Sequence, residues 1–171
     1  VAESFRMLSS NLKYILPNEN TSNVIIATST IKGEGKTFNA LNLSLCLSSL
    51  GNKVLLVGCD LRNPQLHKYL NTKKDVYGLT SFLIDEKSKW RDNILKMFSD
   101  FPLHDVLLSG PVPPNPLQLL NNGNLEKFLH DAKATYDYII LDTAPALLVS
   151  DTITISHLAD AVVFVVKANY T

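Results

Sequence analysis

The stretch VIIATSTIKGEGKT, residues 24–37, decides how the rest of the chain is interpreted. It starts as an apolar run typical of a buried strand, passes through Gly33-Glu34-Gly35-Lys36-Thr37, and enters a helix-compatible segment at once. Glycines let backbone N–H groups turn inward around a phosphate, and the N-terminus of the new helix adds partial positive charge. This context favours a phosphate-binding loop over a surface turn that merely reads GEGKT.

The loop consensus G-x-x-x-x-G-K-[ST] is met except at its first position, which Thr30 occupies. In this motif the lysine, here Lys36, reaches the β- and γ-phosphates, and the hydroxyl of the next residue, here Thr37, ligates Mg²⁺. The expected nucleotide contacts are Gly33, Glu34, Gly35, Lys36, Thr37 and Phe38.

Two further apolar runs each end in an acidic residue. Asp60 follows the run in VLLVGCDLR (residues 54–62), and Asp142 ends the run in YIILDTAP (residues 138–145). Each acid alone could be a helix cap or a loop residue. Open α/β sheets bind ligands at the carboxyl ends of their strands, so the two acids together with GEGKT predict a Mg²⁺–nucleotide site.

Apolar runs and helix-compatible segments alternate along the chain. Strands are expected at residues 24–27, 54–57, 138–141 and 161–166, with a weaker candidate at 105–108; helices are expected at 2–15, 37–50, 79–84, 117–121, 125–134 and 150–158. The near-continuous apolar character of the runs is typical of strands covered on both faces. The pattern predicts an α/β fold of the P-loop NTPase type: doubly wound, with a mainly parallel sheet and helices on both faces.

Composition limits the remaining possibilities. The chain has 171 residues, with 16 Lys and Arg balancing 16 Asp and Glu, so it lacks the basic excess of most nucleic-acid-binding proteins. Its two cysteines, Cys46 and Cys59, make no disulfide framework, which favours a reducing, cytosolic setting. We expect a single P-loop domain over residues 1–171, with an N-terminal helix in 1–17 ended by Pro17 and a nucleotide-binding core in 18–171, excised from a longer protein.

The chain resembles the cytosolic catalytic domain of the bacterial tyrosine kinases of capsule and exopolysaccharide export, which are similar to ParA/MinD-type ATPases. The resemblance rests on GEGKT, DLRNPQLHKYL (residues 60–70), SGPVPPNPLQLL (residues 109–120) and YIILDTAP. It implies an ATP-dependent tyrosine kinase that autophosphorylates in trans, with Lys36, Asp60 and Asp142 as catalytic residues, Thr37, Asp60 and Asp142 as Mg²⁺ ligands, and ATP or ADP as the bound nucleotide.

Two positions depart from these family patterns. The family's second acidic motif reads Asp-x-Asp, whereas this chain has Gly58-Cys59-Asp60. The loss of the first acid leaves a regulatory ATP-binding module with weak or no phosphotransfer as an alternative. A ParA/MinD-like ATPase is a second alternative, although Ile31 stands where those proteins have their signature lysine.

Glu3 and Arg6 match the start of a family Glu-x-x-Arg-x-x-Arg motif for subunit contact, with Ser9 at its third position. They could equally form an intrahelical pair. The resemblance further implies a ring-like homo-oligomer and a polysaccharide co-polymerase of the inner membrane, fused or separate, at whose cytoplasmic side the domain lies. No nucleic-acid partner is expected.

Overall fold

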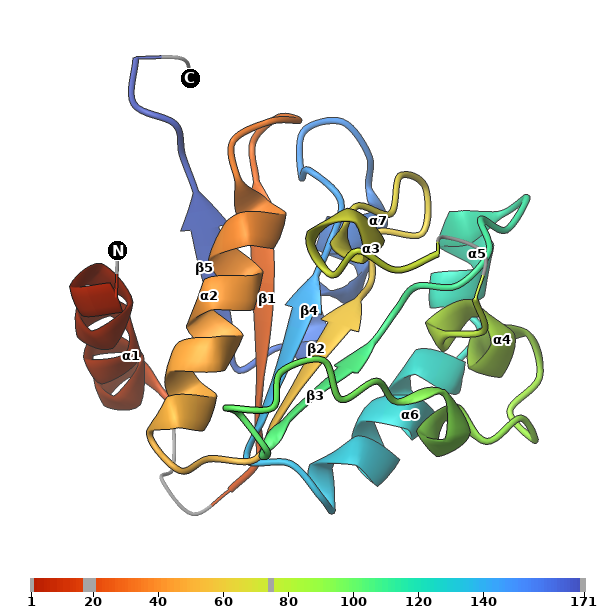
Figure 1. Ribbon diagram of the computed structural model, residues 1–171. Helices are drawn as coiled ribbons and strands as arrows, with labels where there is room; N and C mark the ends of the chain where they lie inside the picture. The colour runs from red at the N-terminus through yellow and green to blue at the C-terminus, as the bar shows by residue number, and fades with distance from the viewer. Residues whose placement is uncertain (1, 17–20, 74–75, 170–171) are drawn as a thin grey trace.

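The computed structural model describes residues 2–16, 21–73 and 76–169, in which helices cover both sides of one sheet (Figure 1). In chain order the elements are α1 (Ala2–Ile15), β1 (Asn23–Ser29), α2 (Lys36–Ser49), β2 (Val54–Gly58), α3 (Leu66–Tyr69), α4 (Leu79–Ile84), η1 (Trp90–Asn93), β3 (His104–Leu107), α5 (Pro116–Leu120), α6 (Asn124–Lys133), β4 (Tyr138–Asp142), α7 (Asp151–Ile155), η2 (Ser156–Leu158) and β5 (Ala161–Val165). The five strands lie in the order β3-β2-β4-β1-β5, and all neighbouring pairs are parallel. The predicted α/β, P-loop NTPase-like class is confirmed.

The strand order opens a crevice at one edge of the sheet. β1 and β4 are neighbours, but α2 leaves β1 toward one face while the connection through α7 leaves β4 toward the other. Diverging connections of this kind create the usual ligand site of an open α/β sheet. The parallel register pairs Ala27 of β1 and Gly58 of β2 with Asp142 of β4, so the three strands end together at this crevice.

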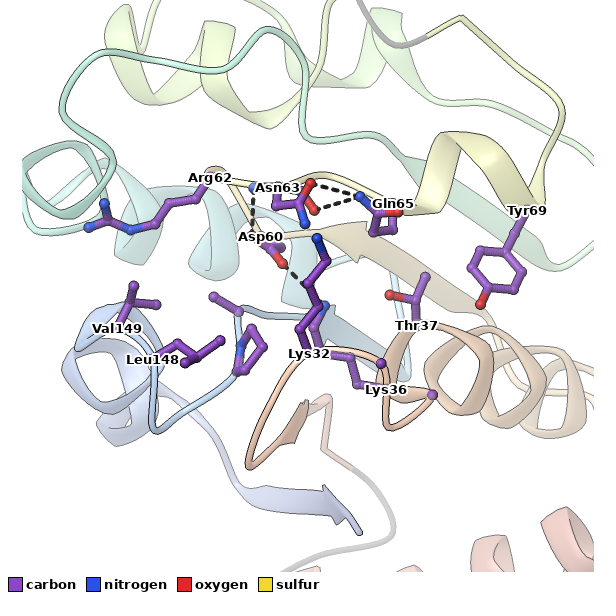
Figure 2. A pocket seen from close by; sticks show the side chains of 14 residues that line it. Lys32, Lys36, Thr37, Asp60, Arg62, Asn63, Gln65, Tyr69, Leu148 and Val149 are labelled. Carbon is purple, nitrogen blue, oxygen red and sulfur yellow. Dashed lines mark hydrogen bonds and ion pairs between the residues drawn. The ribbon is translucent and has the colours of Figure 1, made fainter. Parts of the chain in front are cut away.

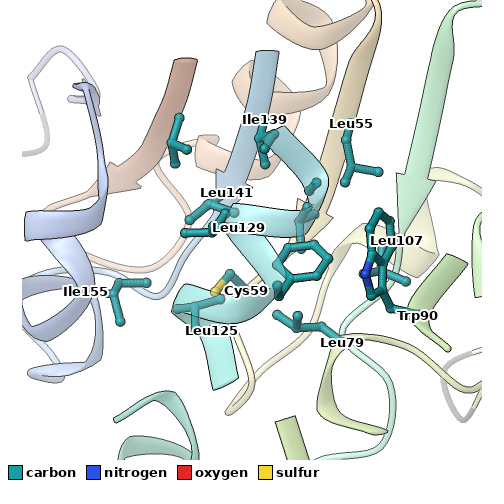
Figure 3. Close-up of a cluster of buried hydrophobic side chains, with 14 of the residues drawn as sticks. Leu55, Cys59, Leu79, Trp90, Leu107, Leu125, Leu129, Ile139, Leu141 and Ile155 are labelled. Atoms are coloured by element: carbon teal, nitrogen blue, oxygen red, sulfur yellow. The ribbon is translucent and has the colours of Figure 1, made fainter. Parts of the chain in front are cut away.

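Alternate residues of the four strands β1 to β4 supply two separate cores. On one face, Ile25 packs in a cluster with Phe5 of α1 and Leu43 of α2. On the other, Ile26 joins the cluster that includes Leu79 of α4 and residues of α6, part of which is drawn in Figure 3. Burial on both faces is what the continuous apolar runs predicted, and it holds the strand ends rigidly in place.

The indole of Trp90 is part of the second cluster. It is 2% exposed, packs edge-on against Phe128 with ring centroids 5.0 Å apart, and donates its Nε1–H to Asp131. A buried indole whose N–H is hydrogen-bonded anchors the packing of the segment that carries it.

The prediction that the strands are buried on both faces is wrong for β5. Val162 and Phe164 are each 50% exposed, while Ala161 and Val163 pack against the α1–α2 face. β5 lies at the edge of the sheet, and among the described residues no helix covers the outer part of its second face, so alternate side chains remain in contact with solvent.

The other differences from the sequence predictions are small. Strand β3 begins one residue before the predicted range, the segment predicted as one helix at 150–158 divides into α7 and η2, and the short helix α3 was not predicted. Pro17, expected to end the first helix, lies outside the described residues. No helix in the described part of the chain is long and apolar enough to span a bilayer.

Candidate functional site

The loop between β1 and α2 has the backbone conformation of a phosphate cradle. Gly33 and Gly35 have φ values of +91° and +93°, a region that residues with a side chain rarely adopt. Gly35 directly precedes α2, whose 14 residues begin at Lys36. The free N–H groups and the positive dipole end of α2 thus lie at the carboxyl edge of the sheet, where an anion would bind.

Lys36 lies between two buried carboxylates. Its Nζ is 3.2 Å from Oδ2 of Asp60 and 3.4 Å from Oδ1 of Asp142. β2 and β4 bring these acids together, since Gly58 pairs with Asp142 and the Cys59 N–H donates to the Asp142 carbonyl at 2.8 Å. The three residues predicted from separate motifs therefore form one cluster.

Burial and neighbouring charges shift the pKa of Asp142 and of the adjacent Cys59. Desolvation raises the pKa of the Asp142 carboxyl, while the Lys36 ammonium and a hydrogen bond from Thr37 oppose that rise. Burial, reinforced by the carboxylates of Asp60, Asp142 and Asp151, also raises the pKa of the Cys59 thiol far above its ordinary range. Cys59 is therefore an unreactive thiol, and it packs in the buried cluster of α4 and α6.

The donor set fits Mg²⁺ bound together with a nucleotide. The Lys36 ammonium shows that the space between Asp60 and Asp142 accepts a cation, and the Thr37 hydroxyl bonds to Asp142 at its edge. Within residues 2–16, 21–73 and 76–169, no group of three or more His, Cys, Asp or Glu side chains could hold a metal. Mg²⁺ commonly binds through one or two carboxylates plus phosphate oxygens and waters, so Thr37, Asp60 and Asp142 are a sufficient protein contribution.

A cavity of about 270 Å³ opens over this cluster (Figure 2). Its lining comes from three places: the phosphate loop and the start of α2, the segment from β2 to α3, and the loop after β4. The lining residues are Lys32, Gly33, Gly35, Lys36, Thr37, Asp60, Arg62, Asn63, Gln65, Tyr69, Ala144, Pro145, Leu148 and Val149. Figure 2 shows Lys32 beside Lys36 in the middle of this lining.

Two of the six expected nucleotide contacts are placed elsewhere than in the cavity lining. Glu34 is 7% exposed, and its carboxylate accepts the Ile31 N–H at 2.9 Å and the Lys167 N–H at 3.3 Å. Glu34 thus stabilises the loop by accepting hydrogen bonds from the backbone. Phe38 is 43% exposed and packs edge-on against Phe5 of α1, with ring centroids 6.5 Å apart.

Glu3 and Arg6 face each other on α1. Arg6 NH1 lies 3.4 Å from Glu3 Oε2, and both side chains are largely exposed. Such a pair stabilises a helix by only a few tenths of a kcal/mol. The intrahelical pairing is what the structure contains, and the subunit contact remains a prediction.

Arg62, two residues after Asp60, could contact a phosphate or pair with a carboxylate, and in the structure it pairs with a carboxylate. Its guanidinium holds both oxygens of Asp151, with Nε–Oδ2 at 2.7 Å and NH2–Oδ1 at 2.9 Å. Asp151 begins α7 and was missed, because an acid at the start of a short helix resembles an ordinary cap. The signal that could have identified it is an acid soon after the YIILDTAP motif.

Comparisons with known proteins find relatives of this chain in sequence and in fold. The profile of the AAA domain matches residues 23–171. The tyrosine-protein kinase YwqD of Bacillus subtilis is 35% identical over 170 residues, covering 99% of this chain and 70% of that protein. Three other curated relatives are much longer, and the chain spans 21–22% of each of them.

Among solved structures, the kinase domain of the Escherichia coli tyrosine kinase ETK superposes with a TM-score of 0.86 at 29% identity, covering 96% of this chain and 62% of that one. The septum site-determining protein MinD of Pyrococcus horikoshii, solved with Mg-ADP, gives a TM-score of 0.67 at 26% identity over 84% of this chain and 57% of that one.

Proposed function

The chain belongs to the AAA-domain family and to the bacterial tyrosine-protein kinases, and from that premise we propose that its site transfers the γ-phosphoryl group of ATP to tyrosine hydroxyls of neighbouring copies. One observation carries the proposal. The Lys36 ammonium at the N-terminus of α2 lies within 3.4 Å of both Asp60 and Asp142, so the cation for phosphate and the carboxylates for Mg²⁺ that such a site uses converge on one place.

The residues of this chain have separable roles in that reaction. The N-terminus of α2 and Lys36 bind the β- and γ-phosphates, and Thr37, Asp60 and Asp142 would hold Mg²⁺. When bound, the ion neutralises charge on the transferring phosphoryl group. The bond from phosphorus to the ADP oxygen breaks as a bond to the tyrosine oxygen forms, and the hydroxyl proton passes to solvent water. Because such transfer depends mostly on positioning and charge neutralisation, a site without the first acidic residue can still support it.

The partners and location follow from family membership. We infer that copies assemble, in a ring by resemblance, with Glu3 and Arg6 of α1 at the contact. The domain would lie on the cytoplasmic side of the inner membrane with a polysaccharide co-polymerase, fused or separate, and regulate capsule or exopolysaccharide synthesis. Support comes from the relatives of which this chain spans only 21–22%, since those proteins carry much additional sequence.

The test uses the full-length protein with Mg²⁺ and ATP, and mass spectrometry to locate phosphotyrosine. Lys36→Met should abolish the modification, whereas Lys127→Met, which removes an exposed lysine paired with Glu86, should leave it intact. ATP binding with no phosphotyrosine would support the regulatory module, an alternative that Gly58 favours. Lipid- or DNA-stimulated hydrolysis without phosphotyrosine would instead support a ParA/MinD-like ATPase.

A further inference from the structure

We propose that Arg62 and Asp151 form a clamp that positions Asp60 for Mg²⁺ binding, and that Arg62 is therefore a positioning residue of this site. The inference rests on the proposed function, because it concerns the same Mg²⁺–nucleotide site. It adds two residues whose contribution acts through Asp60.

The clamp joins two walls of the cavity that are far apart in the sequence. Arg62 follows β2, Asp151 begins α7, and the two residues are separated by 89 positions. Both hydrogen bonds are short and the geometry is bidentate, the strongest form of the arginine–carboxylate contact. The Asp151 side chain is only 4% exposed, whereas that of Arg62 is 41% exposed, so the buried acid fixes the more accessible guanidinium.

Each residue of the clamp belongs to a segment that is connected to one of the two carboxylates, Asp60 or Asp142. On one side, Asp60 lies two residues before Arg62, and its Oδ1 accepts the Asn63 N–H at 3.0 Å. The loop that Arg62 holds is thus the loop that sets the direction of the Asp60 carboxylate. Figure 2 shows Asp60, Arg62 and Asn63 on this one loop above the lysines.

On the other side, Asp151 is anchored through its neighbour Thr152. The Thr152 hydroxyl donates to the Ala144 carbonyl at 2.6 Å, and the Thr28 hydroxyl of β1 donates to the same carbonyl at 2.9 Å. Ala144 lines the cavity two residues after Asp142. The clamp therefore connects the Asp60 loop to the strand ends that carry Asp142, and it adds a side-chain link to the β2–β4 pairing that brings the two carboxylates together.

The test measures Mg²⁺-dependent nucleotide binding in the full-length protein. The readout is the ratio of the ATP dissociation constants without and with Mg²⁺, obtained with a fluorescent ATP analogue. Loss of a residue that orients a metal ligand typically weakens metal affinity by roughly 10- to 100-fold. Arg62→Gln and Asp151→Asn should each reduce the ratio by about tenfold or more, and the double variant should lose little beyond either single change, because the two act as a unit.

Two further variants keep the test decisive. Arg62→Lys retains a cation opposite the buried acid but not the bidentate geometry, so it should fold and give an intermediate ratio. Arg91→Gln removes an arginine of a surface pair with Asp131, away from the cavity, and should leave the ratio unchanged. Reduced melting temperatures with unchanged ratios, or losses that simply add in the double variant, would overturn the clamp. Absence of phosphotyrosine in the wild-type protein would overturn the kinase proposal alone, since the ratio does not depend on transfer.

Discussion

Ser109 occupies the space beside the Gly58 Cα atom, at the carboxyl ends of β2 and β3. A Cβ atom placed on Gly58 would lie 2.6 Å from Ser109 Oγ and 2.9 Å from Ser109 N, closer than real contacts allow. Gly58 is the position where the family has its first acid, so packing as well as composition separates this chain from the Asp-x-Asp pattern.

Gly58→Ala should therefore destabilise the fold although it adds only a methyl group. Overpacking of a tight site costs about 1–3 kcal/mol, measurable as a reduced free energy of unfolding in urea. The double variant Gly58→Ala with Ser109→Ala lacks Oγ but keeps the backbone nitrogen of residue 109. It should therefore regain part of the lost free energy of unfolding. An unchanged free energy of unfolding in Gly58→Ala would show that the Ser109 segment moves freely.

Gly58→Asp tests the missing acid directly. Because the side chain has no room beside Ser109, we expect the single variant to gain no phosphotyrosine-forming activity per folded molecule. Gly58→Asp with Ser109→Ala should be the more active of the two. A rise in activity in the single variant at an unchanged melting temperature would contradict this account and show that the acid is readily accommodated.

Lys36→Met should destabilise the nucleotide-free protein as well as abolish transfer. Removing one partner of a buried ion pair costs about 3–5 kcal/mol, and here two buried carboxylates lose the cation that they share. Thermal unfolding should show a lower melting temperature that Mg²⁺ partly restores. The control is Lys127→Met, which changes an exposed lysine and should leave the melting temperature unchanged. A melting temperature of Lys36→Met equal to that of the wild type would contradict the prediction.

Lys32→Ala should weaken nucleotide binding. Lys32 lines the cavity and has no hydrogen bond or ion pair to another described residue, whereas Lys36 and Arg62 are already paired with carboxylates. A charge-assisted contact with phosphate is worth about 1.5–3 kcal/mol, so the ATP dissociation constant should rise about tenfold or more. The exposed Lys13 on α1 supplies the control variant Lys13→Ala, and equal affinities in the two variants would exclude a role for Lys32.

His104 should make stability depend on pH. The residue is 1% exposed; Nε2 contacts Ser44 Oγ at 2.8 Å, and Nδ1 has no hydrogen-bond partner in the part of the chain that the structure describes. Because Ser44 Oγ donates to the Leu41 carbonyl, it accepts from Nε2–H, which leaves Nδ1 as the atom that protonation would charge. Burial lowers the pKa of His104 from 6.5 to about 4, with Asp105 opposing the shift.

The unfolded chain therefore binds the proton more tightly than the folded one. Stability should be complete above pH 6.5 and fall as the pH drops toward 4, by up to about 3 kcal/mol. Urea unfolding across this range should show a smaller decline in His104→Gln than in the wild type, with the exposed His130→Gln as control. The same decline in both variants would assign the effect to other groups.

Much of the site could be predicted because its signals are local. Gly35, Lys36 and Thr37 are adjacent, and Asp60 and Asp142 each follow a recognisable apolar run, so parallel strands had to bring them to one edge. The roles of Glu34 and Phe38 were less predictable, since a side chain in a phosphate loop can face the cavity or turn to the layer behind it, and only the packed neighbours Lys167 and Phe5 determine which.

The sequence by itself determined the fold class, the phosphate loop and the identity of the two acids, because those features rest on the periodicity of apolar residues and on the conformations that glycine permits. The tertiary structure alone decided that Arg62 binds Asp151, that Ser109 fills the space beside Gly58, and that one face of β5 is exposed. The physical reason is the same in each case: these contacts join segments that are distant in the chain, and their distances are set by the order of strands and the packing of helices over them.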